Sequence, residues 1–311
     1  MCPCGDFLEI YKIDKTFRVK TPETIDPNET NPNAPWVISS VSDAGSSNPI
    51  VARVLLQGYE ILKVAIFDGE INKSDVIKQL HGCKEAILAC ERMARTVGGH
   101  IDRIISDITE QGITRDNHGQ GLNPFPQVPD LDTDCGTFLI QVKRTIKLIC
   151  ELAPLFINLK KPDSNFDSLL KSLSKNLAAK VGEHTPLVKF ITESAPTVRY
   201  LINLRNFHEH PGVTRTIINN FQVLPSGQIA CPTWQLSGIE DTEPHAIKEE
   251  MFEAIDFLIQ IAEAMLIHLV LHRISQQFPF IVQEIPDEEV DSKRPIRFQL
   301  SIDMSKLHLA S

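Results

Sequence analysis

The sequence has few aromatic residues and no excess of positive charge, and each shortage excludes a class of nucleic-acid-binding protein. Its 20 aromatic residues (15 Phe, 3 Tyr, 2 Trp) among 311 are too few for an extended base-stacking surface. The formal charge is −9, from 31 Lys and Arg against 40 Asp and Glu. Such a chain does not coat nucleic acid or an anionic membrane with its whole surface, so any nucleic-acid site must be local.

Several common catalytic and cofactor motifs are also absent. The chain has no Gly-x-x-x-x-Gly-Lys phosphate loop and no Gly-x-Ser-x-Gly nucleophile elbow. The pair Gly119-x-Gly121 lies in a proline-rich loop and not between a strand and a helix. No Glu-x-x-His occurs, which excludes the di-iron carboxylate sites of helical bundles. We therefore expect no cofactor.

The cysteines and the most apolar stretch indicate a cytoplasmic protein without a membrane partner. The seven cysteines are odd in number and scattered, as in a reducing compartment, and residues 1–6 lack the basic and apolar regions of a secretory signal. Polar residues interrupt the stretch from Ile255 to Ile274, so it fails as an unbroken membrane span and predicts a buried helix of a soluble protein.

Apolar residues recur at spacings of three and four through much of residues 49–277, which predicts a mainly α fold. The fold expected is a helical bundle with a β-hairpin inserted at about 214–236 and a small C-terminal β-hairpin at about 280–309. Residues 1–47 predict an extended arm, and 48–311 a single domain. The expected helices cover about 49–67, 74–111, 137–159, 165–181, 186–210 and 244–277.

Two groups of residues resemble metal ligands only in their spacing. His268 and His272 are four apart on a predicted helix, but their neighbours are apolar and no glutamate follows His268. Cys2 and Cys4 have no second pair at zinc-finger spacing. We interpret the histidines as hydrogen-bonded buried or interface residues and predict no metal site.

The segment Leu201–Gly212 places polar residues at the end of an apolar helix. Arg205 and Glu209 are four apart, which predicts an ion pair on one helix face, and histidines near the C-terminus complement the helix dipole. Proline disfavours helical backbone in the residue before it, so His210, before Pro211, should leave the helix and be able to turn toward Arg205. Composition alone favours a structural role for this segment.

The pattern Arg205-Asn206-x-x-x-His210 resembles the Arg-x4-6-His signature of the HEPN superfamily, including the polar residue after the arginine. The resemblance implies a helical bundle whose dimer brings two copies of the motif together, often as a metal-independent endoribonuclease. It implies catalytic roles for Arg205, Asn206 and His210. We expect substrate binding by Arg199, Arg215 and His208. The β-hairpin expected after the motif departs from the family pattern.

The side chains suit RNA cleavage, because RNA supplies its own nucleophile in the 2′-hydroxyl. Histidine can move the protons and arginine can stabilise the charge on the phosphate, without a metal. The local charge permits RNA binding here, because residues 185–220 contain four Lys and Arg and two Glu, which gives a formal charge of +2. We expect a cytoplasmic homodimer acting on RNA, of the toxin or antiviral-defence kind that the resemblance suggests, with a protein partner or antitoxin as a further possible ligand.

Two alternatives stay open from the sequence. One is a non-catalytic HEPN-like module that uses the same surface to bind a nucleotide, an RNA or a protein partner. The other is a structural helical interaction protein in which the motif match is accidental. The net negative charge of the chain favours both alternatives over an enzyme that acts on nucleic acid. The expectation of a dimer rests on the apolar stripes of residues 137–159 and 245–276.

Overall fold

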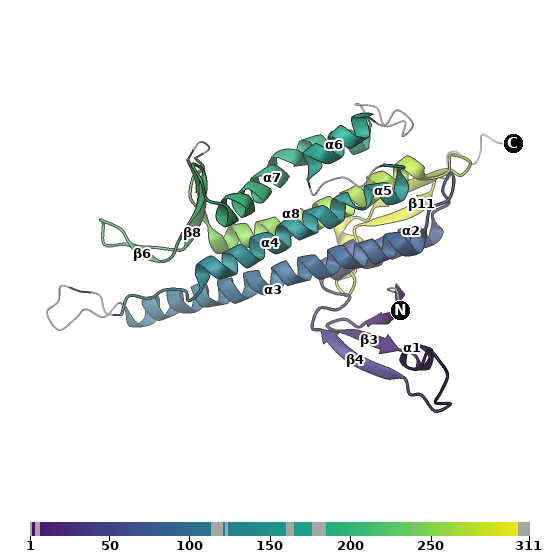
Figure 1. The fold of residues 1–311 in the computed structure, drawn as a ribbon, viewed down its shortest axis with the longest axis horizontal. Coiled ribbons are helices and arrows are strands. Elements are labelled where there is room, and N and C mark those ends of the chain that lie inside the picture. The colour runs from purple at the N-terminus through teal and green to yellow at the C-terminus, as the bar shows by residue number, and fades with distance from the viewer. Residues whose placement is uncertain are drawn as a thin grey trace. The chain divides into compact units, whose positions relative to one another are not determined.

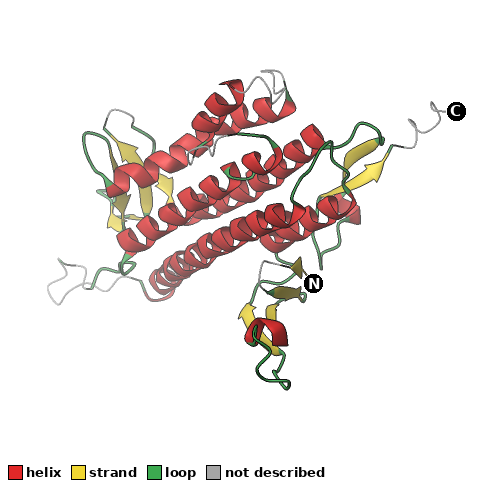
Figure 2. Ribbon diagram, turned by 45° about the vertical axis from the view of Figure 1, so that its right-hand side comes forward, coloured by secondary structure: helices red, strands yellow, loops and turns green. Residues whose placement is uncertain are grey.

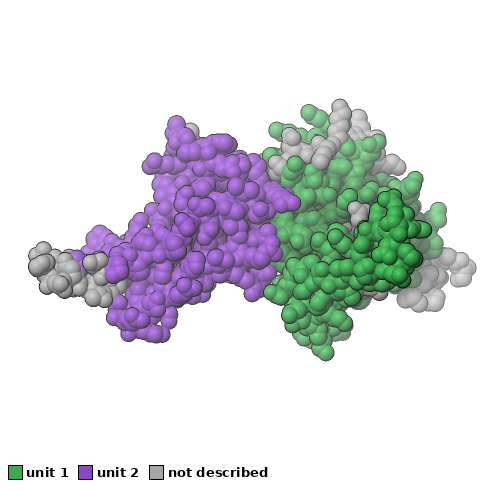
Figure 3. Space-filling model, turned by 60° about the horizontal axis from the view of Figure 1, so that its bottom comes forward, with its two compact units in different colours: residues 1–88, 145–195, 259–311 green, residues 89–144, 196–258 purple. Residues whose placement is uncertain are grey.

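A computed structural model describes residues 2–3, 7–112, 121, 124–159, 165–175, 185–238 and 241–303. The chain divides into two compact units, which Figure 3 shows in different colours. Unit 1 comprises Met1–Leu88, Thr145–Ala195 and Ile259–Ser311, and unit 2 comprises Ala89–Arg144 and Pro196–Leu258. The predicted division into an arm and one domain stays a prediction.

The helical elements appear along the chain as follows (Figure 1). They are α1 (Pro22–Ile25), the π-helix η1 (Ile50–Leu56), α2 (Gln57–Val64), α3 (Lys73–Gln111), α4 (Leu131–Cys150), α5 (Ala153–Phe156), α6 (Phe166–Lys175), α7 (Pro186–Glu209), α8 (Ile247–Arg273) and the 3-10 helix η3 (Asp287–Glu289).

The strands form four small antiparallel sheets, which Figure 2 shows in yellow beside the helices. Their orders are β1-β2-β3-β4, β5-β8-β9, β6-β7 and β10-β11. The strands are β1 (Cys2–Pro3), β2 (Leu8–Tyr11), β3 (Thr16–Lys20), β4 (Val37–Ser42), β5 (Arg215–Asn219), β6 (Gln222–Val223), β7 (Ile229–Ala230), β8 (Thr233–Ser237), β9 (His245–Ala246), β10 (Phe280–Glu284) and β11 (Phe298–Ile302).

The predicted fold class, a mainly α helical bundle with β additions, is wrong. Of the described residues, 54% are helical and 16% lie in strands of four sheets, so the fold is mixed α and β. The four-stranded sheet of residues 2–42 falls where the sequence predicted an extended arm. β2 (LEIY) and β3 (TFRVK) do alternate apolar and polar residues, but they have only four and five residues. β4 is exposed along almost its whole length and does not alternate, so the pattern is too short to indicate a sheet.

Local signals explain where the long helices begin and end. Asn72 caps α3, because its Oδ1 accepts hydrogen bonds from the backbone N–H of Ser74 at 3.1 Å and of Asp75 at 3.3 Å. Gly112 follows the last residue of α3 with φ of 67°, a left-handed conformation that favours glycine at this position. α7 continues through Pro196 as one helix.

Unit 1 contains a buried polar network beside the π-helix η1. Arg53 of η1 donates two hydrogen bonds to the carboxylate of Glu263, which is only 3% exposed. The buried side chain of Gln57 donates to the same carboxylate at 2.9 Å. Its Oε1 accepts from the backbone N–H of Arg297 and Phe298, both at 2.7 Å. Gln57 therefore links the start of β11 to the ion pair of Arg53 and Glu263.

Unit 2 has its core around Trp234 of β8, whose side chain is fully buried. The ring centroid of Trp234 lies 6.1 Å from that of Phe138 on α4. Thr216 of β5 donates a hydrogen bond to the carbonyl oxygen of Leu204 on α7 at 2.7 Å. The sheet β5-β8-β9 is thus tied directly to the helix that carries the Arg205 motif.

α8 is the one helix, within the described parts of the chain, that is long and apolar enough to cross a membrane by length and composition. In its most apolar window, 67% of the residues are buried inside the protein, and buried core helices pass the same test.

The apolar stripes that suggested a dimer are largely buried within the single chain. The stripe of α4, including Phe138, Val142 and Ile146, is buried, as is most of that of α8. The dimer itself stays a prediction. Other predictions lie partly outside the described residues: 176–181 of the helix 165–181, 304–309 of the C-terminal hairpin, most of the Gly- and Pro-rich loop before residue 124, and Cys4.

Candidate functional site

The Arg205 motif lies at the C-terminal end of α7, within unit 2. The helix ends at Glu209, so His210 lies outside it, as Pro211 predicts. The arginine is 20% exposed, and its guanidinium pairs with the carboxylate of Glu209, as the i,i+4 spacing predicts. Its Nη1 donates to Oδ1 of Asn206 at 3.2 Å, while its buried Nε has no hydrogen-bond partner among the described residues.

Lys143 of α4 joins this site, although no pattern in the sequence indicated it. Its Nζ donates to Oδ1 of Asn206 at 3.0 Å, so two cations converge on one amide oxygen. Burial lowers the pKa of Lys143, the charge of Arg205 lowers it further, and Glu209 opposes the shift. Lys143 is 63 residues from Asn206 in the sequence, and only the packing of α4 beside α7 brings them together.

His210 is the exposed member of the site. Its side chain is 78% exposed, and Nε2 lies 3.8 Å from the carboxylate of Glu209. No hydrogen bond joins His210 to Arg205 in the described structure; the carboxylate of Glu209 pairs with both. Glu209, which falls in the variable stretch of the motif, therefore connects the two residues.

The predicted substrate-binding residues differ in their exposure to solvent. The ring of His208 packs on Gly136, where a Cβ atom would come within 2.6 Å of Cε1. Its Nε2 lies 3.2 Å from Oδ1 of Asp132, so the structure holds His208 in place. Arg199 of α7 and Arg215 of β5 both have exposed side chains. The structure thus brings together Arg205, Asn206 and, through Glu209, His210.

A second cluster of charged residues, in unit 1, was not anticipated from the sequence. Glu9 of β2 is fully buried, and its carboxylate accepts from Lys84 at 2.9 Å, from Arg18 at 3.0 Å and from the hydroxyl of Tyr11. Lys84 is itself only 1% exposed. Residues 9 and 84 have no local relation in the sequence, so no pattern could have paired them.

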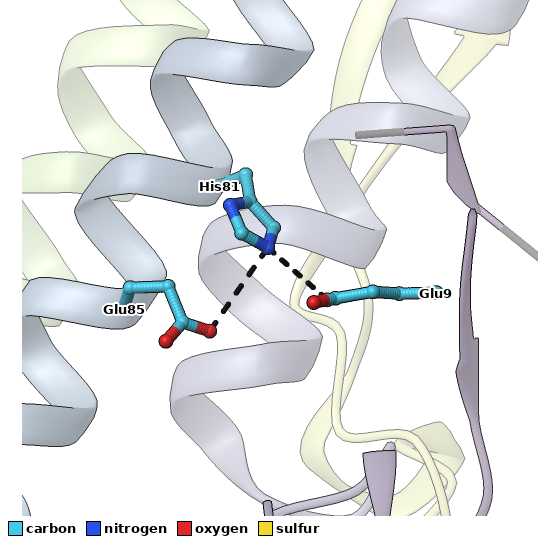
Figure 4. A group of neighbouring side chains, drawn as sticks. All are labelled: Glu9, His81 and Glu85. Carbon is cyan, nitrogen blue, oxygen red and sulfur yellow. Dashed lines mark ion pairs between the residues drawn. The ribbon is translucent and has the colours of Figure 1, made fainter. Parts of the chain in front are cut away.

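The Glu9 cluster is also the one group within the described residues that could hold a metal ion (Figure 4). The ligand atoms of Glu9, His81 and Glu85 lie within 4.8 Å of one another, and His81 Nε2 is 3.1 Å from Glu9 and 4.0 Å from Glu85. However, Nζ of Lys84 contacts both carboxylates, at 2.9 and 2.8 Å. Lys84 and Arg18 balance the two negative charges, so we assign this cluster a structural role.

Comparisons with models of protein families, with curated proteins and with solved structures gave no match. The resemblance to the HEPN superfamily therefore depends on the residues of the motif and on their surroundings in unit 2.

Proposed function

We propose that the chain is a metal-independent endoribonuclease of HEPN type, which cleaves RNA through attack of the 2′-hydroxyl on the adjacent phosphate. One observation carries the proposal. Lys143 and Arg205 converge on Asn206 at a helix end where the imidazole of His210 is exposed. Two cations held at fixed positions are suited to a phosphate whose negative charge increases in the transition state.

Each side chain has a definite part in the proposed reaction. The 2′-oxygen forms a bond to phosphorus while the bond from phosphorus to the 5′-oxygen breaks. One proton leaves the 2′-hydroxyl and one is delivered to the 5′-oxygen, and imidazole groups near neutral pKa perform such transfers. The resemblance implies two motif copies from two chains, so one His210 would accept the first proton and the other would donate the second. Asn206 would hold the two cations in position.

The activity test replaces His210 with alanine. We expect cleavage of single-stranded RNA in the presence of a chelator to fall by at least about 100-fold, because the proton-transfer group is lost. The fold should be unchanged, because the side chain is 78% exposed. His245→Ala removes another exposed histidine of unit 2 and should leave cleavage intact. The readout is the amount of new ends carrying a 2′,3′-cyclic phosphate. Cleavage that persists in His210→Ala, or that requires an added divalent metal, contradicts the proposal.

Glu209 provides a second prediction, because its carboxylate neutralises Arg205 and must give way to a phosphate. Replacing Glu209 with glutamine should tighten binding of single-stranded RNA by about fivefold, equivalent to about 1 kcal/mol. Fluorescence anisotropy of a labelled RNA measures this. The matched control is Glu193→Gln, which removes an exposed carboxylate paired with Lys189 on the same helix. Weaker or unchanged binding by Glu209→Gln would show that Arg205 is not a phosphate ligand.

The Arg205–Glu209 pair also favours the second candidate function, a non-catalytic HEPN-like module that binds nucleotide, RNA or a protein partner. An arginine already paired with a carboxylate is a weaker stabiliser of a transition state. This alternative predicts RNA binding that responds to Glu209→Gln, but no new RNA ends with the wild-type chain.

A further inference from the structure

The edge strand β4 of unit 1 is uncharged and presents apolar side chains to solvent. Among the described residues it pairs with β3 alone, and it forms the outer strand of the sheet β1-β2-β3-β4 (Figure 1). Ile38 is 64% exposed and the preceding Trp36 is 62% exposed, and Val37 and Val41 are also exposed. Edge strands usually carry charged residues or proline, which prevent pairing with another chain. β4 has neither, and the segment 31–42 contains no charged residue.

Two apolar rows of the sheet run across the strands and end at β4. In the first row, Leu8 lies opposite Val19, and Val19 lies opposite Ile38. Leu8 is half-buried and Val19 is only 5% exposed, so the row passes from a buried valine to an exposed isoleucine at the edge of the sheet. A partner strand that presents an apolar residue beside Ile38 would extend this row.

The second row has a different ending. Ile10 lies opposite Phe17, and Phe17 lies opposite Ser40. The small side chain of Ser40 leaves space at the edge of the sheet, beside Phe17. The second row therefore lacks a large apolar side chain at Ser40. On a partner strand, such a side chain would lie two residues from the one that contacts Ile38, on the same face of the sheet.

We propose that β4 pairs antiparallel with β4 of a second copy of this chain, about a two-fold axis at Ile38. In this register Ile38 meets Ile38, and Trp36 of each copy lies opposite Ser40 of the other. Each copy thereby adds Ile38 to the first row of the other copy and Trp36 to its second row. The ladder uses residues 36–40 and avoids the irregular pairing of β4 with β3 near Val41.

A second copy is the occupant that the residues favour. The strand is complementary to itself in shape, as an isologous interface requires, and two uncharged strands approach without repulsion. A charged peptide would find no opposite charge in residues 31–42. The free backbone N–H and C=O groups of the edge supply the hydrogen bonds of the continuous sheet.

The test measures the mass of the full chain in solution by light scattering and sedimentation, from about 1 to about 100 µM, where small interfaces associate. The wild type is expected at no less than twice the single-chain mass of 34.9 kDa. Ile38→Lys places two like charges opposite each other and should halve the wild-type mass, and Ile38→Glu should do the same. An equimolar mixture of the two variants should recover the wild-type mass, because lysine then lies opposite glutamate.

The control is Val213→Lys, which adds the same charge at a valine of unit 2 that is 79% exposed, and it should leave the mass unchanged. Circular dichroism establishes that each variant is folded. A wild-type chain that is monomeric up to about 100 µM overturns the proposal, as does an unchanged mass in Ile38→Lys. Failure of the folded lysine and glutamate variants to associate with each other overturns the register at Ile38. The RNA-cleavage assay is separate, because these variants leave Arg205, Asn206 and His210 unchanged.

Discussion

Replacing Lys84 with methionine is expected to lower the free energy of unfolding by about 3 kcal/mol or more. The side chain of Lys84 is 1% exposed, and its ammonium contacts the fully buried carboxylate of Glu9 at 2.9 Å. Methionine keeps most of the apolar stem but removes the charge, so Glu9 retains only Arg18, Tyr11 and His81 as partners. Removing one partner of a buried ion pair is costly because the remaining charge is poorly compensated. Urea denaturation followed by circular dichroism measures the change.

The matched control is Lys189→Met, because Lys189 is 73% exposed and its partner Glu193 is 65% exposed, with 3.8 Å between them. Exposed pairs contribute little, so the change should stay within about 0.5 kcal/mol. A loss in Lys84→Met as small as that of the control would mean that the other partners of Glu9 suffice to compensate its charge.

The same cluster makes stability depend on pH in the acid range. Burial alone would raise the pKa of Glu9, but the imidazole of His81 3.1 Å away and the charge of Lys84 outweigh it and hold the pKa well below its usual value of 4.5. A carboxyl with a lowered folded-state pKa stabilises the protein above the pKa of the unfolded chain, and this contribution is lost as pH falls toward the folded pKa. The wild type should therefore lose stability below about pH 4.5 more steeply than Lys84→Met.

Replacing Trp234 with alanine is expected to lower the free energy of unfolding by about 3 to 5 kcal/mol. Its side chain is fully buried, packs near Phe138, and donates a hydrogen bond from Nε1 to the carboxylate of Glu250. Alanine would leave a cavity in unit 2 and remove a donor from Glu250. Thermal and urea denaturation measure the loss.

The chain supplies a matched control, because its other tryptophan, Trp36, is 62% exposed. Trp36→Ala should change the stability of the single chain by less than about 1 kcal/mol. Trp234→Phe keeps most of the ring volume and separates the hydrogen bond from the cavity, with an expected loss between the other two. Equal losses in Trp36→Ala and Trp234→Ala would contradict the placement of β8 in the core.

Much of the helical structure could be predicted from the sequence because helix signals are local. The spacing of apolar residues in 186–210 and the proline at 211 predict a helix that stops before Pro211, and α7 ends at Glu209. The sequence also predicts the Arg205–Glu209 pair, which needs only the geometry of one helix turn.

The N-terminal sheet could not be predicted in the same way. Strand pairing joins residues that are distant along the chain, and β4 has no alternating pattern because it is exposed along almost its whole length. The prolines and asparagines around it favoured an extended arm. The mixed fold class therefore depends on pairings such as Val19 with Ile38, which only the folded chain defines.

The sequence by itself determined the identity and order of the motif residues, Arg205, Asn206 and His210, and their position at a helix end. The tertiary structure decided what surrounds them, bringing Lys143 to Asn206 and Thr216 of β5 to the backbone of Leu204 on α7. It also decided that Glu9, an ordinary acidic residue in the sequence, is buried against Lys84. The reason is physical: local hydrogen bonds and side-chain spacing are fixed by neighbouring residues, whereas burial and charge pairing depend on segments that meet only when the chain folds.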